Sequence, residues 1–245
     1  MLWGYPIVGD WPRQIHTTVG ARSGQRSTDE VVRHVVNVTD EDVVEHEGLL
    51  VTTPLRTLCD LARLAPFVTG VAALDRAVAA PRDGDATPSI HVPREALLER
   101  AASITGKRGV RRLRQAIDFA DGRSGSAGET FSRVQIGRLR MPRPDLQVEV
   151  VDLEGRLWHS DFGWEEVRQL GEFDGLVKYT RNQFLRGRSV ADVVIAEKLR
   201  EDAMRAASGC GTVRWVYAVA ANLPRFERLL RGAGLRPENS RLIVL

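Results

Sequence analysis

The chain has 245 residues, of which 43% are hydrophobic and 27% charged, and this balance is typical of a soluble globular protein of one or two domains. The formal net charge of +3 and the pI near 9.2 permit a nucleic-acid partner without requiring one. No run of about 18 apolar residues exists and the first residues lack a signal-peptide pattern, so we expect a cytoplasmic protein without a membrane span.

The first part of the chain changes from β-rich to helical at Thr53. Before it, β-branched runs separated by polar breaks predict three strands: Ile15–Val19, Val31–Val38 and Leu49–Thr52. Thr53 followed by proline is a helix-start signal, because threonine caps the helix and proline fits its first position. Apolar residues at helical spacing then predict four helices: 54–65, 67–80, 93–102 and 107–120.

The last of these helices opens with a basic segment, G-K-R-G-V-R-R-L-R, that contains no acid. A solvated helix face accounts for such a segment. The functional alternative is a surface that contacts nucleic-acid phosphates, helped by backbone N–H groups at the helix start. No aromatic residue is interleaved, so such a surface would contact the backbone and not stack on bases. The candidate nucleic-acid-binding residues are Lys107, Arg108, Arg111, Arg112 and Arg114.

A small, polar, Gly-rich segment, D-G-R-S-G-S-A at 121–127, separates two periodic regions and predicts a boundary between domains 1–122 and 123–245. Ser126 and Glu129 fit the S-x-x-E capping box at the start of the next helix. After this helix the patterns predict a strand at 147–153, a hairpin, a helix at 189–207, a strand at 212–219 and a closing helix at 222–232. The order at the core of this domain is α-β-β-β-α-β.

The hairpin lies in Arg156–Tyr179, where the runs R-L-W-H-S-D-F-G-W and R-Q-L-G-E-F-D-G flank a polar break. Side chains at i and i+2 share one face of a strand, so Glu172 and Asp174 project together while Phe173 points to the opposite layer. Asp161 can face this pair across the ladder, where opposed residues lie roughly 5 Å apart. Three oxygen donors in this arrangement predict a site for a divalent cation.

A structural interpretation competes with the metal site. Asp174 and Gly175 form a common turn dipeptide, and Glu172 on an edge strand would simply be solvated. Because like charges on one face of a sheet repel each other, their clustering favours a bound cation or a basic partner. Both interpretations stay open at this point.

The order of elements and the motifs resemble two known families. Residues 124–218 resemble the PD-(D/E)XK restriction-endonuclease-like superfamily, in particular proteins similar to very-short-patch-repair endonucleases, through S-A-G-E, S-D-F-G-W, G-E-F-D-G-L-V-K-Y and E-K-L-R-E-D-A. The chain also resembles AbiEi-family antitoxins of type IV toxin–antitoxin systems, with V-T-T-P-L-R-T-L-C-D-L-A at Val51–Ala62 as a further motif. The resemblance implies an α/β protein with an AbiEi-like α+β region at 1–122 and a restriction-endonuclease-like core at 123–245.

The resemblance also implies roles for individual residues. Asp161 matches the metal-binding aspartate of the superfamily, Glu172 the acid of the following strand, and Glu129 the helix glutamate found near many such sites. Active nucleases of this type carry lysine two residues after the second acid, where this chain has Asp174. Lys178 is the nearest substitute, and Lys198 on the following helix is the alternative. The expected ion is Mg²⁺, with Asp161, Glu172 and Asp174 as ligands and the same three acids, Lys178 and Glu129 as the catalytic set.

Proteins of the antitoxin family begin with a winged helix-turn-helix segment that binds DNA, and we expect the region 1–122 to lack it. The sequence has no P-loop and no G-x-G-x-x-G after a strand, so we expect no nucleotide cofactor. Its histidines show no metal-ligand spacing. Three functions remain: a DNA-associated regulator of the antitoxin type with a cognate toxin, a Mg²⁺-dependent DNA endonuclease, and a protein-interaction module without a nucleic-acid role.

Overall fold

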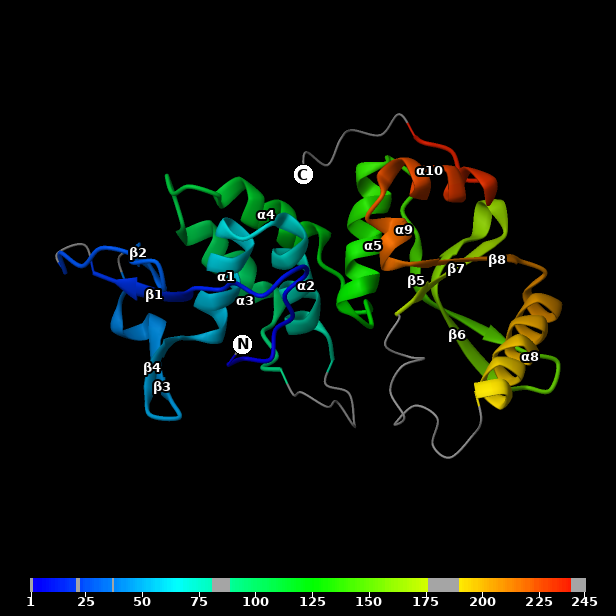
Figure 1. Cartoon of the computed structure of the whole chain (residues 1–245), viewed down its shortest axis with the longest axis horizontal. Coiled ribbons are helices and arrows are strands. Elements are labelled where there is room, and N and C mark those ends of the chain that lie inside the picture. Colours follow the sequence, from blue (N-terminus) through cyan, green and yellow to red (C-terminus); the bar gives the residue numbers. More distant parts are fainter. Residues whose placement is uncertain (1, 21–22, 37, 81–88, 176–189, 239–245) are drawn as a thin grey trace. The chain divides into compact units, whose positions relative to one another are not determined.

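The computed structural model describes residues 2–20, 23–36, 38–80, 89–175 and 190–238 (Figure 1). The chain divides into two compact units, Met1–Ala120 (unit 1) and Asp121–Leu245 (unit 2). The division falls close to the position between residues 122 and 123 that the sequence suggests. No helix within the described residues is long and apolar enough to cross a membrane.

Unit 1 contains two small sheets. Strands β1 (Ile15–Val19) and β2 (Val31–Val35) pair in parallel, and β3 (Val43–His46) pairs antiparallel with β4 (Leu49–Thr52). The predicted strands β1 and β4 are confirmed, whereas β2 ends three residues earlier than expected. Strand β3 escaped prediction because its four residues lie in an acid-rich stretch that follows the 3₁₀ turn Asp40–Asp42.

Four helices form the core of unit 1: α1 (Pro54–Leu64), α2 (Phe67–Val78), α3 (Arg94–Ser103) and α4 (Val110–Phe119). The Thr53 cap is confirmed, since its side chain accepts a hydrogen bond from the Arg56 N–H. Each helix contributes fully buried aliphatic side chains, among them Leu58, Leu74, Leu97, Leu113 and Ile117.

Helix α4 begins three residues later than the sequence predicts. Gly109 precedes it with a φ of 82°, a left-handed conformation that glycine adopts without strain. A Cβ atom at this position would lie 2.4 Å from the carbonyl oxygen of Arg63, so no other residue fits. Lys107 and Arg108 therefore precede the helix and do not belong to its first turn.

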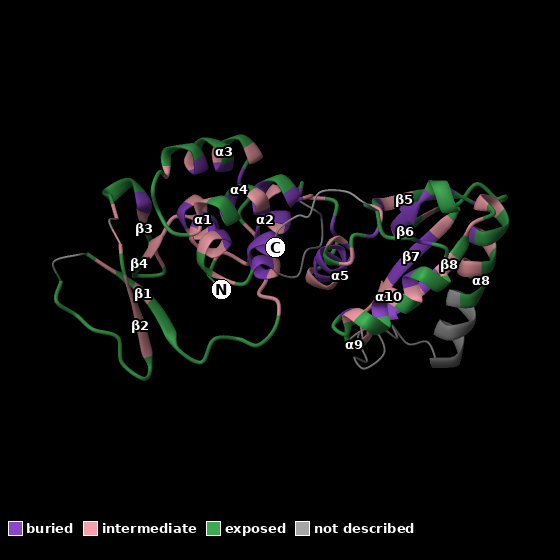
Figure 2. Ribbon diagram, turned by 90° about the horizontal axis from the view of Figure 1, so that it is seen from above, coloured by how far each residue is buried: buried purple, intermediate pink, exposed green. Residues whose placement is uncertain are grey.

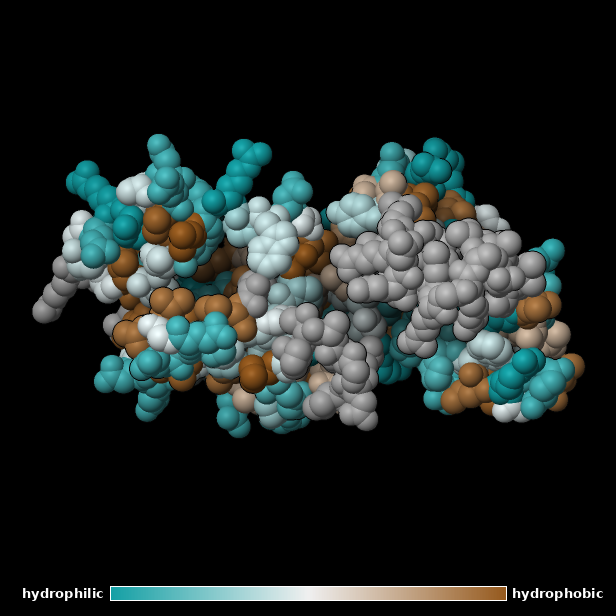
Figure 3. All heavy atoms as spheres, turned by 60° about the horizontal axis from the view of Figure 1, so that its bottom comes forward, coloured by the Kyte–Doolittle hydropathy of each residue, from teal (hydrophilic) through white to brown (hydrophobic). Residues whose placement is uncertain are grey.

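Apolar side chains remain on the surface of unit 1. Strand β4 exposes Leu49 and Leu50, and the parallel pair exposes Ile15 and Val35. Figure 3 shows hydrophobic residues among hydrophilic ones on one face of this unit. The small sheets are thus less buried than the helical core, where most residues of α2 are buried (Figure 2).

Unit 2 is built on one mixed sheet in the order β5-β6-β7-β8, with antiparallel pairing except between β7 and β8, which are parallel. Its strands are β5 (Asp145–Val151), β6 (Leu157–Trp164), β7 (Gln169–Asp174) and β8 (Gly211–Val216). The helices among its described residues are α5 (Ala127–Arg138), α8 (Val190–Ser208), α9 (Tyr217–Ala220) and α10 (Leu223–Gly232), and the 3₁₀ turn Glu165–Val167 joins β6 to β7. The predicted order of helix, three strands, helix and strand is confirmed.

Helices cover both faces of this sheet. On one face, the Trp215 indole N–H donates to Ser132 of α5 over 2.8 Å, and the Trp215 ring packs against Phe162 and Phe226. On the other face, Met204 of α8 packs against Val150 and Leu170 among others. The strand predicted to reach Val219 ends at Val216 because the chain turns there into α9, which lies against α5.

Candidate functional site

The three predicted carboxylates, Asp161, Glu172 and Asp174, lie where β6 and β7 separate. Their register runs from Trp164 opposite Gln169 to Phe162 opposite Gly171 and then stops, while β7 continues its pairing with β8. Asp161 is the next residue along β6, and its Oδ2 accepts a hydrogen bond from the Phe173 backbone N–H over 2.8 Å. The Asp161 side chain thus replaces the missing backbone pairing and holds the end of β7 against β6.

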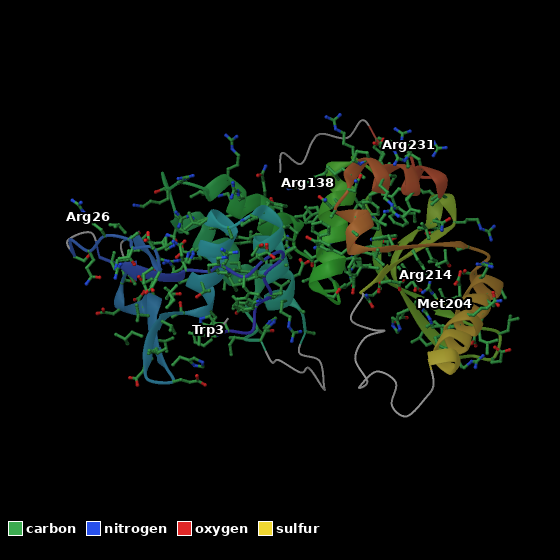
Figure 4. The ribbon with its side chains drawn as sticks, viewed as in Figure 1. Trp3, Arg26, Arg138, Met204, Arg214 and Arg231 are labelled. Carbon is green, nitrogen blue, oxygen red and sulfur yellow. The ribbon has the colours of Figure 1, made fainter. Side chains whose placement is uncertain are left out.

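Glu172 occupies the α8 face of β7 beside this end and is only 7% exposed. Both of its carboxylate oxygens accept hydrogen bonds from Arg200 Nη2 of α8, at 2.8 and 2.6 Å. Arg214 Nη2 of β8 lies 3.0 Å from Glu172 Oε2. We call Glu172, Asp174, Arg200 and Arg214 the arginine-paired cluster, of which Figure 4 labels Arg214.

Asp174 shares the face of Glu172, as predicted, and is the last residue of β7, opposite Val216 of β8. Its Oδ1 lies 3.6 Å from Arg214 Nη1. Phe173 points to the opposite layer, where it contacts the position of Gly128 on α5. The alternation predicted for these three residues is confirmed.

Electrostatics at Glu172 combine two opposing effects. Burial raises the pKa of Glu172 above its ordinary value, while the hydrogen bond and charge of Arg200, and then the charge of Arg214, lower it. The nearby Asp161 adds a small further rise in the Glu172 pKa. Two guanidinium groups therefore supply the positive charge that the sequence analysis assigned to a cation or a basic partner.

The described donors do not fit a magnesium ion at this cluster. Both oxygens of Glu172 accept from Arg200, and within the described part of the chain no group of three or more His, Cys, Asp or Glu residues is arranged to hold a metal. Mg²⁺ prefers near-octahedral oxygen coordination, which an arginine-bound carboxylate does not offer. Lys178, the expected catalytic lysine, lies outside the described residues.

Glu129 has a capping role. Its Oε1 accepts from the Ser126 hydroxyl at 2.9 Å, and the Glu129 N–H donates to the same hydroxyl, which confirms the predicted capping box. Its Oε2 accepts from the Gly125 N–H at 2.7 Å and from the Gln147 amide at 3.2 Å. Gln147 has a φ of 52° and is left out of the β5–β6 register, so Glu129 ties the start of α5 to an irregular point of β5.

The basic segment before and within α4 is exposed, as predicted, but part of it serves the fold. Arg112 donates to the carbonyl of Ala65 over 2.9 Å, and Arg63 donates to the carbonyl of Arg108. These bonds attach the basic segment to Arg63 of α1 and to Ala65, which directly follows α1. The structure brings Lys107, Arg108, Arg111, Arg112 and Arg114 together on one exposed segment of unit 1.

Sequence reasoning missed the two arginines of the cluster. Arg200 lies on α8, and its side chain is only 18% exposed because it pairs with Glu172 of β7. Arg214 stands inside the apolar run T-V-R-W-V, and a charged residue in a buried strand needs a partner. That signal was present in the sequence, and it points to an acid on a neighbouring strand.

A second charged group ties unit 1 together. Asp42 is 6% exposed, and its carboxylate accepts from Arg56 of α1 at 2.6 Å and from Arg100 of α3 at 2.5 Å. Its backbone carbonyl accepts from the Thr53 N–H. Asp42 thus joins the segment before β3 to two helices.

Comparison with known proteins gives a match for unit 1. Residues 8–119 match the AbiEi antitoxin C-terminal domain. This match covers most of unit 1 and supports the AbiEi-like antitoxin character expected from the sequence. The match ends at residue 119, so the PD-(D/E)XK part of the resemblance stays a prediction.

Two curated proteins of Mycobacterium tuberculosis are also similar, the uncharacterized proteins MT2308 of strain CDC 1551 and Rv2248 of strain H37Rv. Each is 30% identical over 129 residues, which are 53% of this chain and 44% of the relative. The chain therefore spans less than half the length of these relatives. No solved structure matches the chain.

Proposed function

We propose that the protein is a DNA-associated regulator of the AbiEi antitoxin type, whose unit 2 has a nuclease-like layer used for binding and not for cleavage. The match of residues 8–119 to the AbiEi antitoxin C-terminal domain carries the first part of this proposal. An antitoxin acts against a cognate toxin, so a toxin is the second expected partner beside DNA.

The arginine-paired cluster supports the second part. A hydrolytic site of the superfamily keeps its acids available to a metal and a lysine near the second acid, as the resemblance implies. Here Glu172 is held by Arg200 and Arg214, and the residue in the lysine position, Asp174, is itself close to Arg214. Arginine cannot give up its proton near neutral pH, so both guanidinium groups keep their positive charge beside Glu172 across the physiological range.

The test is incubation of supercoiled and linear DNA with the purified chain and Mg²⁺ or Mn²⁺, beside the double variant Asp161→Ala, Glu172→Ala. We expect salt-sensitive binding of DNA and no cutting. Binding without cutting supports the regulator, and the absence of any DNA binding contradicts it and leaves the protein-interaction module.

An endonuclease is the alternative, and one observation favours it: Asp161, Glu172 and Asp174 come from two strands to the same end of the sheet. Cutting by the wild-type chain that the double variant loses would establish this alternative and place the chemistry at the arginine-paired cluster. Cutting that survives in the variant would indicate a contaminating nuclease.

The antitoxin character has its own test. A candidate toxin from the same genome is expressed alone and together with the chain, and growth is followed. We expect the chain to restore growth. A variant of exposed residues in unit 1, Arg111→Gln with Arg114→Gln, then shows whether the basic segment takes part.

A further inference from the structure

A group of exposed arginines gathers at one end of unit 2, away from the carboxylates. Its members come from the end of α5 and from α10 with the segment that follows it, and we call them the arginine surface: Arg138, Arg140, Arg225, Arg228, Arg231 and Arg236. All six are exposed. Figure 4 labels Arg138 and Arg231 on these two helices.

The fold brings these distant segments together. The Glu238 N–H donates to the carbonyl of Arg140 over 2.8 Å, so the chain after α10 lies against the turn that follows α5. The Gln135 amide donates to the carbonyl of Ala220, which fixes α9, just before α10, on α5. The arginine surface is therefore one feature of the folded unit and not a run of charge in the sequence.

Helix α10 presents its arginines on the side opposite to its core contacts. Phe226 and Leu230 are buried, and Arg225, Arg228 and Arg231 follow at three-residue spacing on the exposed side. Residues at this spacing lie about 5–6 Å apart on a helix. Their guanidinium groups thus form a short row on the surface.

Little acidic charge compensates this row. Glu227 pairs with Arg231 at 2.8 Å, whereas no carboxylate of the described residues lies within 4.0 Å of Arg140, Arg225 or Arg228. The chain has no acidic residue between Thr130 and Pro144. Like charges at helical spacing repel each other, so a site of this composition is suited to an anionic partner.

The chemistry of the surface favours phosphate. All six residues are arginines, whose planar fork donates two parallel hydrogen bonds to phosphate oxygens. The only aromatic side chain of α10, Phe226, is buried, so the row offers no platform on which bases stack. Duplex nucleic acid fits this surface, because it presents repeated phosphates to the arginines and its paired bases need no aromatic platform.

The arginine surface is separate from the arginine-paired cluster. Glu129 and Arg138 stand at opposite ends of α5, about 14 Å apart by the helical rise. The end of β7 that carries the cluster lies at the Glu129 end, since Phe173 contacts the position of Gly128. Substitutions in one place therefore leave the other intact.

We propose that the arginine surface of unit 2 binds the phosphate backbone of duplex DNA without reading its sequence. This proposal rests on the DNA association proposed above and assigns the surface that carries it. It also replaces α4 of unit 1 as the main nucleic-acid contact, because the arginine surface gathers its charge from several segments of the fold whereas the basic residues of α4 come from one.

The experiment measures binding of the full chain to a fluorescent duplex of random sequence over a series of salt concentrations. Arg225→Gln with Arg228→Gln is compared with wild type, and Arg111→Gln with Arg114→Gln, two exposed arginines of α4, is the matched control. We expect the α10 variant to bind at least about tenfold more weakly and to lower the salt slope by about two, one for each lost phosphate contact. We expect the α4 variant to bind like wild type, and duplexes of different sequence to bind alike.

Each contrary outcome has a distinct meaning. If wild type shows no salt-sensitive binding, both the DNA association and this surface are wrong. If wild type binds and the α10 variant keeps its affinity and slope, DNA association stands and the arginine surface is wrong, and loss in the α4 variant would move the contact to unit 1. Should the α10 variant lose its thermal unfolding transition, Arg138→Gln with Arg140→Gln tests the same surface from α5.

Discussion

At the scale of single residues, substitution of Glu172 distinguishes a cation-binding site from a cluster whose acids are already neutralised by arginines. Removing one member of a buried ion pair leaves the other uncompensated, which costs about 3 kcal/mol. In a cluster of repelling acids without a cation, the same change would relieve repulsion and stabilise the fold. The sign of the effect therefore separates the two descriptions without any assay of DNA cleavage.

We predict that Glu172→Gln lowers the free energy of unfolding by about 3 kcal/mol, because Arg200 and Arg214 lose their shared carboxylate. Urea denaturation in metal-free buffer measures it. The control is Glu149→Gln, an exposed acid of the same sheet that lies near His159, with an expected change within about 0.5 kcal/mol. A stabilising effect of Glu172→Gln, or a wild-type Tm that rises with Mg²⁺, would contradict the arginine pairing.

The second residue-scale prediction concerns Asp42. We expect Asp42→Asn to destabilise unit 1 by about 3 kcal/mol at neutral pH, since Arg56 and Arg100 both lose a charged partner. Burial opposes ionisation of Asp42, but the charges of Arg56 and Arg100 outweigh it and hold the pKa below the ordinary value of 3.8. A lowered pKa in the folded state stabilises the protein above pH 3.8 and loses this effect as the pH falls through the folded value.

The difference in stability between wild type and Asp42→Asn should thus be constant near neutral pH and shrink below about pH 4. Urea denaturation at a series of pH values measures it, with Asp118→Asn, an exposed acid of α4, as the control. A difference that grows on acidification would show that Asp42 is not held ionised by its arginines.

At the scale of elements, unit 2 depends on the close approach of α5 to the sheet. A Cβ atom on Gly128 would lie 2.0 Å from the Phe173 ring, far inside contact distance. Gly128→Ala must therefore displace α5 or Phe173, and we expect a loss of about 1–3 kcal/mol, although alanine favours helices. Gly232→Ala in α10 meets no atom within 4 Å and should be neutral or slightly stabilising. Thermal unfolding of both variants tests the comparison, and equal Tm values would contradict this packing.

The elements were largely predictable because their signals are local. Thr53 before proline, the Ser126–Glu129 box and the alternation in β7 each act within a few residues, and all three are confirmed. The start of α4 was wrong because the left-handed turn at Gly109 is fixed by its contact with Arg63, which is distant in sequence. Strand β3 was missed because four residues among acids carry too little pattern.

The candidate site was less predictable than the fold. The sequence identified Asp161, Glu172 and Asp174 as neighbours because strand periodicity sets their faces. It did not identify Arg200 and Arg214 as their partners, since pairing across α8, β7 and β8 depends on how distant segments pack. The resemblance to nucleases predicted a metal ion beside Glu172, where the structure has the guanidinium groups of Arg200 and Arg214.

At the scale of the whole molecule, the two units keep their charge clusters to themselves. The described partners of Asp42 all belong to unit 1, and those of Glu172 all belong to unit 2. Effects of substitutions that share no partner usually add within about 0.5 kcal/mol. Substitutions at Asp42 and Glu172 therefore test whether the two units are energetically coupled.

We predict that Asp42→Asn speeds hydrogen exchange of core amides in residues 1–120 alone and Glu172→Gln in residues 121–245 alone, because each loss destabilises only its own unit. Mass spectrometry of peptides from the single and double variants measures both effects in one experiment. The double variant should show the sum of the single changes. Faster exchange in unit 2 caused by Asp42→Asn would mean that the units unfold together, and substitutions in the AbiEi-like unit would then be expected to alter DNA binding by unit 2 through stability alone.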